Sequence, residues 1–221
     1  MYTKKYLLYT LVLFILLIAI IEIYINYTQI AYYLTFSRSK SDVPTIPHVI
    51  KKVSNIINRI TNNNKKQFLF IDIGCGDGNL IKEICEYNIF HKCIGIEYDL
   101  KSFFKAKENC KNNKNIEINN IDALKYNLKH KPTIFYLYEP FFDIEYSKAI
   151  KMYNKLLYNM NKLGKHTGEI YIIYVSGIIP VRRRGITKSL LNKYNFTVIN
   201  KYNVGSLFIR RNIYLAKFKN I

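Results

Sequence analysis

Acidic residues are scarce in this chain, and their distribution is uneven. Asp and Glu make up 15 of the 221 residues, against 34 Lys and Arg, which gives a formal net charge of +19. Ala, Gly and Pro are also sparse, while Asn, Lys, Ile and Tyr are abundant, as codon usage in an A/T-rich genome produces. Because that bias inflates Lys without selecting for a partner, the net charge alone does not indicate a nucleic-acid-binding protein.

No acid follows Glu169, although ten basic residues do: Arg182, Arg183, Arg184, Lys188, Lys193, Lys201, Arg210, Arg211, Lys217 and Lys219. Arg is less favoured by the codon bias than Lys, so the run at residues 182–184 is the best signal for a partner. No basic and aromatic interleaving typical of a nucleic-acid module is visible. An anionic membrane surface or an acidic protein is therefore favoured over nucleic-acid phosphate, which stays as the rival use.

Cysteine is rare and is not arranged for a shared task. The four cysteines, at positions 75, 85, 93 and 110, have neither metal-ligand spacing nor the spacing of a disulfide framework. The sequence therefore predicts no metal site and unpaired thiols in a reducing compartment.

A long apolar run lies near the N-terminus, from Leu7 to Ile25, with Glu22 as its single charge. Nineteen helical residues span the ~30 Å hydrocarbon core of a bilayer. Tyrosines gather at both flanks, where interfacial aromatic residues are common. A cleaved signal peptide is the alternative, but no small-x-small cleavage site follows the run. We predict one uncleaved transmembrane helix, and the nearly balanced basic residues on its two sides leave its orientation open.

The most informative segment is Phe70 to Asn79, an apolar strand that leads into three glycines and then into a helical pattern. Such a strand-to-helix turn lets a nucleotide-like ligand approach bare backbone N–H groups. The dinucleotide fingerprint G-x-G-x-x-G requires its third glycine where this chain has Asn79. The glycines stand instead at positions 74, 76 and 78, and Asp72 precedes them, where it would repel a pyrophosphate and attract a cation.

This segment resembles the first motif of the class I S-adenosylmethionine-dependent methyltransferases, an acid followed by x-G-x-G-x-G. The resemblance implies that Asp72, Gly74, Cys75, Gly76 and Gly78 form part of a binding site for S-adenosylmethionine. A plain turn is the alternative for the glycines, and a small space-filling role is favoured over a nucleophilic one for Cys75.

Further candidate ligands follow at the ends of later strands. Glu97 ends the apolar run Cys93 to Glu97 about twenty residues past the loop, where a carboxylate can accept both ribose hydroxyls. Tyr98 follows it. After a run at residues 116–118, Asp122 and Ala123 match the family position that contacts the adenine amino group. Glu97 and Asp122 could instead be ordinary loop acids.

A fourth strand, Ile134 to Tyr138, ends in Glu139, Pro140 and Phe141. In the resembled family this place lies beside the transferable methyl, and amine methyltransferases often have Asp or Asn, two prolines and an aromatic residue there. An oxygen acceptor can orient the lone pair of a target nitrogen, and an aromatic ring can stabilise a sulfonium. Glu in place of Asp or Asn, and Phe141 in place of the second proline, depart from that pattern. Glu139 could therefore be catalytic or could only shape the pocket.

The acids that are present concentrate at predicted strand ends: Asp72, Asp77, Glu97, Asp99, Asp122, Glu139 and Asp143. These ends share one edge of a parallel sheet, so the edge suits a cationic ligand.

The element order predicts an α/β Rossmann-like three-layer sandwich. Its mostly parallel, seven-stranded sheet would end in an antiparallel hairpin at residues 196–204 and 207–218, and one transmembrane helix would precede it. Helices are expected at residues 48–59, 101–111 and 143–163, and a fifth strand at residues 169–175. The division is an anchor at residues 1–36, a linker at 37–47 and a methyltransferase domain at 48–221.

The resulting prediction is a membrane-anchored methyltransferase that acts on a nitrogen, foremost a protein lysine or another amine. Small-molecule or lipid methylation and a non-catalytic S-adenosylmethionine-binding scaffold are the alternatives. Because the cofactor is made in the cytosol, the catalytic domain is expected on the cytosolic side of the membrane.

Overall fold

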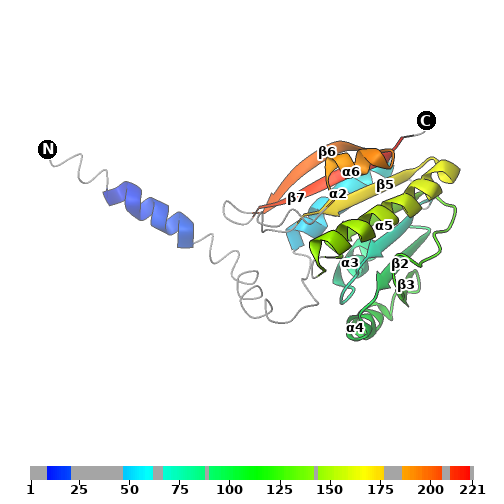
Figure 1. Ribbon diagram of the computed structural model, residues 1–221. Helices are drawn as coiled ribbons and strands as arrows, with labels where there is room; N and C mark the ends of the chain where they lie inside the picture. The colour runs from blue at the N-terminus through cyan, green and yellow to red at the C-terminus, as the bar shows by residue number, and fades with distance from the viewer. Residues whose placement is uncertain are drawn as a thin grey trace.

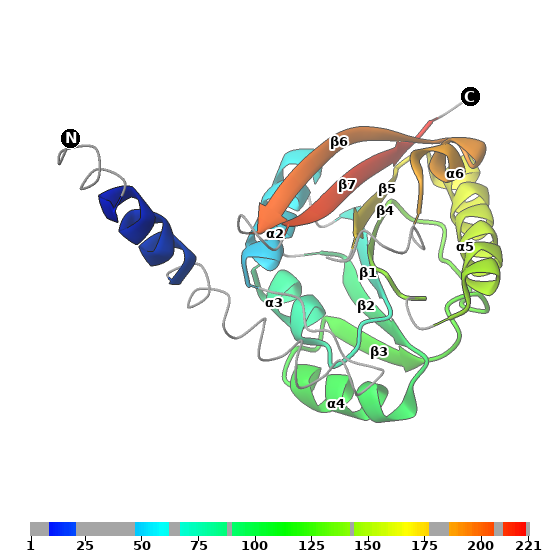
Figure 2. The same ribbon diagram turned by 60° about the vertical axis from the view of Figure 1, so that its left-hand side comes forward.

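The computed structural model describes residues 9–20, 47–61, 67–87, 90–141, 144–176, 186–205 and 210–219. Within these ranges, a seven-stranded mixed sheet lies between helices on its two faces (Figures 1 and 2). The predicted α/β architecture with a C-terminal hairpin is therefore confirmed.

The strands follow the order β3-β2-β1-β4-β5-β7-β6. Their bounds are β1 Leu69–Ile73, β2 Lys92–Glu97, β3 Ile116–Asn120, β4 Thr133–Tyr138, β5 Ile170–Val175, β6 Phe196–Gly205 and β7 Arg210–Phe218. The first five are parallel, whereas β7 pairs antiparallel with both β5 and β6. The order in which the chain adds strands to the sheet reverses between β1 and β4, and the carboxyl ends of these two parallel strands lie side by side at the position where such sheets bind ligands.

Two hydrophobic clusters fill the space between the sheet and its helices. One face of the sheet packs on α5 (Tyr146–Thr167) and α6 (Lys188–Lys193), and the other packs on α2 (Pro47–Thr61) and α3 (Asn79–Tyr87). Every residue of β1 and of β5 is buried, as expected for central parallel strands covered on both faces. The loops at the carboxyl ends of these strands are therefore attached to buried, well-packed central strands.

Helix ends differ from the sequence prediction in ways that local bonds explain. Helix α5 continues to Thr167 because Gly168, at φ 70°, forms a left-handed cap whose N–H donates to the carbonyl of Gly164. Helix α6 was not predicted, because six residues are too few to show helical periodicity. It begins after Thr187, whose hydroxyl accepts a bond from the N–H of Leu190. Helix α4 (Leu100–Cys110) begins after Asp99, which caps it through Ser102.

The N-terminal helix extends over residues 9–20 in the described part of the chain. Its apolar side chains are exposed all round; Leu13, for example, is 65% exposed. No helix within the described ranges is long and apolar enough to cross a membrane. Residues 7, 8 and 21–25 of the predicted span, and residues 37–46 of the predicted linker, lie outside those ranges, so the structure gives no support to the transmembrane segment.

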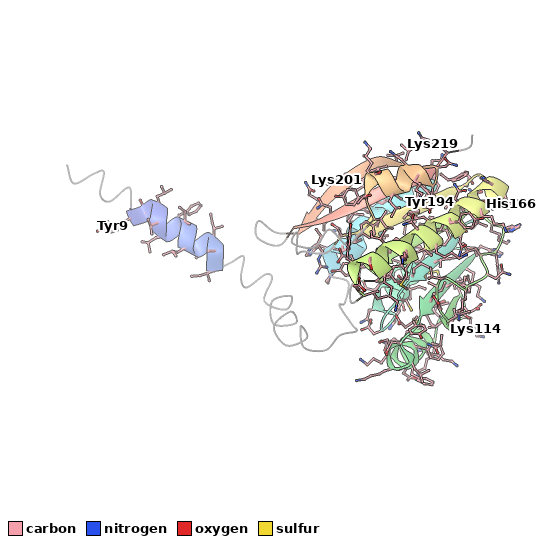
Figure 3. The ribbon with its side chains drawn as sticks, viewed as in Figure 1. Tyr9, Lys114, His166, Tyr194, Lys201 and Lys219 are labelled. Carbon is pink, nitrogen blue, oxygen red and sulfur yellow. A yellow bond between two sulfur atoms is a disulfide. The ribbon has the colours of Figure 1, made fainter. Side chains whose placement is uncertain are left out.

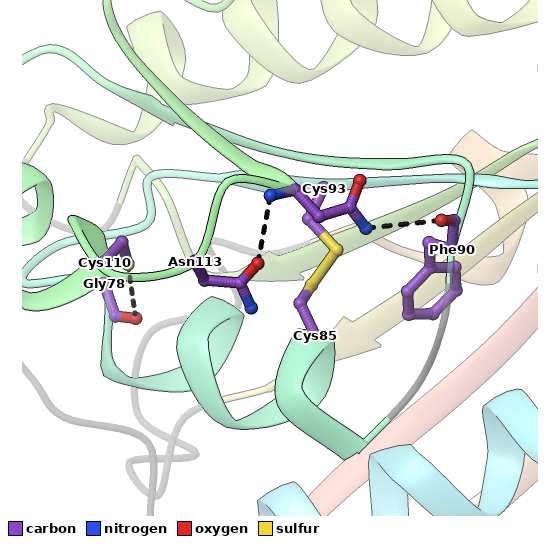
Figure 4. Close-up of a disulfide and its surroundings, with 7 residues drawn as sticks. Gly78, Cys85, Phe90, Cys93, Cys110 and Asn113 are labelled. Carbon is purple, nitrogen blue, oxygen red and sulfur yellow. Dashed lines mark hydrogen bonds between the residues drawn. A yellow bond between two sulfur atoms is a disulfide. The ribbon is translucent and has the colours of Figure 1, made fainter.

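The prediction of four unpaired cysteines is wrong. Cys85 near the end of α3 and Cys93 in β2 form a disulfide, with their Cα atoms 6.5 Å apart (Figure 4). The eight-residue spacing gave no sign of the bond, because the packing of α3 against β2 brings the two residues together. Cys75 and Cys110 are free and buried. The cysteines therefore no longer argue for a reducing compartment.

Reduction of this disulfide is expected to destabilise the fold. Closing a loop of eight residues restricts the unfolded chain by about 2.5 kcal/mol in the loop-entropy model. For a domain of this size that corresponds to a fall of roughly 5–10 °C in melting temperature. Thermal unfolding with and without a phosphine reductant measures the shift. The double variant Cys85→Ser/Cys93→Ser serves as the control and should not respond to the reductant; an equal response in both proteins would contradict the disulfide.

Candidate active site at the carboxyl ends of β1, β2 and β4

Three glycines turn the chain from β1 into α3. Gly74, Gly76 and Gly78 have φ angles of 74°, 56° and 81°, a region that disfavours any side chain. A Cβ on Gly74 would lie 3.1 Å from Cβ of Pro140, and one on Gly78 would lie 3.0 Å from Ala106. The loop is therefore pressed between the end of β4 and α4, and its glycines are needed for close approach as well as for backbone conformation.

The loop N–H groups are not presented to a ligand as the sequence analysis expected. Those of Gly74 and Cys75 donate to the carbonyl of Ile96 at 2.8 and 3.1 Å. The N–H of Gly78 bonds to the carbonyl of Cys75, and that of Asn79 bonds to Asp77. Since these N–H groups already form hydrogen bonds within the protein, the loop is poorly suited to bind a pyrophosphate. A ligand can still pack against the glycine backbone, which carries no side chains.

Glu97 holds the loop from the end of β2. Its Oε2 accepts the N–H of Gly76 at 2.9 Å, and its Oε1 accepts the N–H of Asp99 at 2.8 Å. Burial raises the pKa of Glu97, and these two bonds act in the opposite direction. Each carboxylate oxygen retains lone-pair capacity for one further donor. Glu97 can therefore fix the loop and still accept the ribose hydroxyls that the sequence analysis assigned to it.

Cys75 fills the space between the loop and β2. Its side chain is buried, and its Sγ would lie 2.8 Å from a Cβ on Gly95. Burial, followed by the charges of Asp72 and Glu97, raises the pKa of the thiol well above its usual value. A thiol that stays protonated is a poor nucleophile, which favours the space-filling role.

The edge of the sheet concentrates negative charge around the loop. Asp72 in β1 is 2% exposed, and burial raises its pKa well above the ordinary value, with smaller effects from Glu97 and Asp77. A buried carboxyl beside two other acids is stabilised in its charged form by a cation. These carboxylates can accept hydrogen bonds from the ammonium group of S-adenosylmethionine and attract its sulfonium group. The glycine cradle fits its adenosine part, so the residues present suit this cofactor.

Cofactor binding is expected to release a proton from Asp72. Because its pKa is raised in the folded protein, Asp72 stays protonated at pH values above about 3.9, the pKa of Asp in an unfolded chain. A bound cation favours the carboxylate and therefore its deprotonation. Affinity should therefore rise with pH through the window between that value and the raised pKa. Calorimetric titration with S-adenosylmethionine in two buffers of different ionisation enthalpy counts the protons. The variant Asp72→Asn should lose the Asp72 share of the release, and an identical count in both proteins would exclude Asp72 as its source.

The remaining predicted cofactor ligands occupy more open positions. Tyr98 is 78% exposed just after β2. Asp122 follows β3, and its Oδ1 accepts the N–H of Leu124 at 2.9 Å, while Ala123 packs at the margin of the α5-side cluster. The turn bond at Asp122 is what an ordinary loop acid makes, so its adenine contact stays a prediction.

At the end of β4, Glu139 has a φ of 42°, which is rare for a residue with a side chain. Pro140 packs on Gly74, which joins this corner to the glycine loop. Phe141 is 7% exposed and meets Tyr153 edge-on, with ring centroids 4.9 Å apart. The ring of Phe141 thus lies in the core and supports the corner from inside, and its predicted role beside the sulfonium stays a prediction.

Two buried tyrosines behind this corner were missed by the sequence analysis. Tyr153 in α5 and Tyr174 in β5 are 1% and 2% exposed. Burial raises the pKa of each, and the charge of Glu139 adds to both shifts. Nothing in the local sequence marked them, because a tyrosine on an apolar helix or strand face is indistinguishable from a core residue.

Comparison with known proteins supports this assignment of the site. A family model described as "Putative methyltransferase" matches residues 66–172, slightly less than half of the chain. Comparison with curated protein sequences gives no match. Many solved structures share the fold. Three of them do so at low sequence identity, and the match covers nearly the full length of each of these three proteins.

The N-methyltransferase NodS of Bradyrhizobium japonicum WM9, in complex with S-adenosyl-L-homocysteine, has a TM-score of 0.60 at 12% identity, covering 85% of this chain and 98% of that one. The magnesium protoporphyrin IX methyltransferase ChlM of Synechocystis PCC 6803, with bound SAM, has a TM-score of 0.59 at 12% identity over 91% of this chain and 96% of that one. An S-adenosylmethionine-dependent methyltransferase of Clostridium acetobutylicum ATCC 824 has a TM-score of 0.59 at 15% identity over 89% and 99%.

The glycine cradle, the acidic strand ends and the family-model match lead to one conclusion. The chain has a Rossmann-like domain, and the family-model match supports the assignment of this domain as an S-adenosylmethionine-dependent methyltransferase.

Proposed function

We propose that the chain transfers the methyl group to a nitrogen acceptor, foremost a protein lysine or another amine. The observation that carries this proposal is the corner at the end of β4. Glu139 holds a strained φ of 42° there, and Pro140 packs on Gly74 of the cofactor loop. Strain is retained where the surrounding structure fixes it, often at functional sites. NodS, one of the similar structures, is an N-methyltransferase.

The chain's own residues have three tasks in this reaction. Asp72 and Glu97 would hold the cofactor, which supplies a methyl group already activated on a sulfonium. Glu139 would accept an N–H bond of the acceptor and orient its lone pair toward the methyl. The same carboxylate can take up the proton that the nitrogen loses, either directly or through water. Phe141 and Tyr153 would keep the corner rigid from the core side.

Label transfer tests the proposal. The full chain is incubated with methyl-labelled S-adenosylmethionine and with membranes or small amines, and label is sought in protein, lipid and nucleic acid. Acid hydrolysis then separates N-methyl from O-methyl and S-methyl products. Label on protein or small-molecule nitrogen supports the proposal. Label exclusively on oxygen or sulfur would overturn the nitrogen acceptor while leaving the methyltransferase assignment intact.

We also propose that the N-terminal segment anchors the enzyme to a membrane. The large apolar side chains of residues 9–20 are exposed all round; Leu11, Phe14 and Ile20, for example, are 55%, 60% and 62% exposed. Such a surface is costly in water and favourable in lipid. Lipid or small-molecule methylation is the second candidate function, because an anchored active site would meet membrane components first.

The basic C-terminal residues are a separate support for a membrane or acidic partner. Lys188, Lys193, Lys201, Lys217 and Lys219 are exposed. Figure 3 shows Lys201 and Lys219 at the outer side of the β6–β7 hairpin. Arg211 is the exception and a correction to the sequence-based patch, because its side chain is 3% exposed. Arg182, Arg183 and Arg184 lie outside the described residues.

A further inference from the structure

Arg211 lies buried at the edge of the sheet that carries the active site. In the β5–β7 register, Val175 pairs with Ile213, so Arg211 lies just beyond the carboxyl end of β5. The guanidinium carbon lies 5.0 Å from the ring centroid of Tyr138, which ends β4 and directly precedes Glu139. Arg211 therefore contacts the residue that precedes the proposed acceptor position, on the opposite side of β4 from the glycine loop.

At least two of the three guanidinium nitrogens of Arg211 lack a hydrogen-bond partner among the described residues. Its side chain is 3% exposed, and neither Nε nor Nη1 has a hydrogen-bond partner within the described ranges. The ion pairs found there join Lys92 to Glu117 and Lys111 to Glu108. A buried arginine is normally paired, since an unpaired buried charge is strongly unfavourable.

A histidine and a hydroxyl lie near Arg211. The pKa of His48, at the start of α2, is lowered first by burial and then by the charge of Arg211. A cation–π contact with Tyr138 is compatible with hydrogen bonds from the guanidinium N–H groups to other partners. Ser176, at the end of β5, adds a hydroxyl nearby, bonded to the backbone of Asn212. The unpartnered Nε and Nη1 groups of this planar cation fit an oxyanion.

We propose that Arg211 binds a carboxylate or phosphate group of the methyl acceptor. This inference rests on the proposed function and narrows its substrate class to amines that carry an oxyanion close to the methylated nitrogen. A buried arginine near the acceptor would repel a protonated amine. An oxyanion on the acceptor removes that repulsion and anchors the molecule while its nitrogen lies at Glu139.

Anion titration of the full chain in uncharged detergent tests this subsite without requiring methyl transfer. Inorganic phosphate and sodium acetate are titrated separately into wild-type protein, Arg211→Met and Arg59→Met. Arg59 is exposed on α2, so its variant loses the same charge far from the proposed site. The wild type should bind at least one of the anions saturably, Arg211→Met at least ten-fold more weakly, and Arg59→Met like the wild type. Acetate binding alone assigns a carboxylate, and phosphate binding alone assigns a phosphate group.

S-adenosylmethionine affinity, measured in the same proteins, should be unchanged in all three. Without anion, Arg211→Met should unfold at the wild-type temperature or higher, because it removes an unpaired buried charge. If the wild type shows no saturable binding of either anion, or if Arg211→Met binds as the wild type does, the subsite is wrong. The wild-type titration decides the matter even if Arg211→Met fails to fold. If Arg211→Met loses anion binding but the wild-type enzyme gives O-methylated products, the anion subsite would be retained and the nitrogen acceptor would be overturned.

Discussion

Glu97→Gln is expected to weaken the binding of S-adenosylmethionine about a hundred-fold, equivalent to about 2.7 kcal/mol. Both carboxylate oxygens of Glu97 accept backbone N–H groups, one from Gly76 of the glycine loop and one from Asp99. An amide can supply only one acceptor oxygen, so its NH₂ group would face an N–H donor. The variant therefore loosens the loop and also removes an oxygen that would accept a ribose hydroxyl.

Calorimetry with S-adenosylmethionine and S-adenosylhomocysteine measures this loss. Both ligands share the ribose, so both affinities should fall to a similar extent. Glu117→Gln is the matched control, because Glu117 lies on the neighbouring strand β3 and pairs at the surface with Lys92. That variant should bind both ligands as the wild type does. Wild-type affinity in Glu97→Gln would remove Glu97 from the cofactor site.

The sheet could be predicted because its signals are local. The strand at Ile170–Val175 is an unbroken apolar run, and the strand at Leu69–Ile73 is apolar except for Asp72. The glycines at 74, 76 and 78 mark a turn that needs positive φ. The mostly parallel sheet then followed from the alternation of predicted strands and helices. The cofactor could also be predicted from the sequence, because the spacing of the glycines and the position of Asp72 are properties of one short segment.

Features that depend on packing between distant segments could not be predicted. The disulfide joins Cys85 and Cys93 only because α3 packs on β2. The loop N–H groups turned out to be used internally, since Ile96 on the neighbouring strand accepts two of them. Arg211 looked like part of a solvent-exposed basic tail, but its place at the start of β7 buries it against Tyr138. In each case the partner lies on another element, where sequence periodicity carries no information.

The active-site corner could be predicted in part. Its place after the fourth strand followed from the motif order, and Pro140 is in contact range of Gly74. The unusual backbone of Glu139 could not be seen, because nothing in the sequence around it demands a positive φ. The two tyrosines behind it, Tyr153 and Tyr174, are buried on apolar faces and resemble core residues in sequence.

Glu139→Gln is expected to slow methyl transfer about 10²- to 10³-fold while leaving S-adenosylmethionine affinity within two-fold of the wild type. The amide keeps the size of the side chain and its ability to accept a hydrogen bond through oxygen, but it cannot take up a proton. Single-turnover transfer and calorimetry on the same protein separate the two effects. Glu145→Gln is the control, because Glu145 is exposed at the start of α5 and its carboxylate accepts a hydrogen bond from the hydroxyl of Ser147.

A second variant separates the carboxylate from the strained backbone at this corner. Glycine tolerates the φ of 42° without cost, so Glu139→Gly should keep the corner in place and lose only the side chain. If the carboxylate acts on the acceptor, Glu139→Gly should be at least as slow as Glu139→Gln. If Glu139 only shapes the pocket, Glu139→Gln should transfer at the wild-type rate, since its size is unchanged. An unimpaired rate in Glu139→Gln would therefore remove Glu139 from proton transfer, and an unimpaired rate in both variants would remove it from the mechanism.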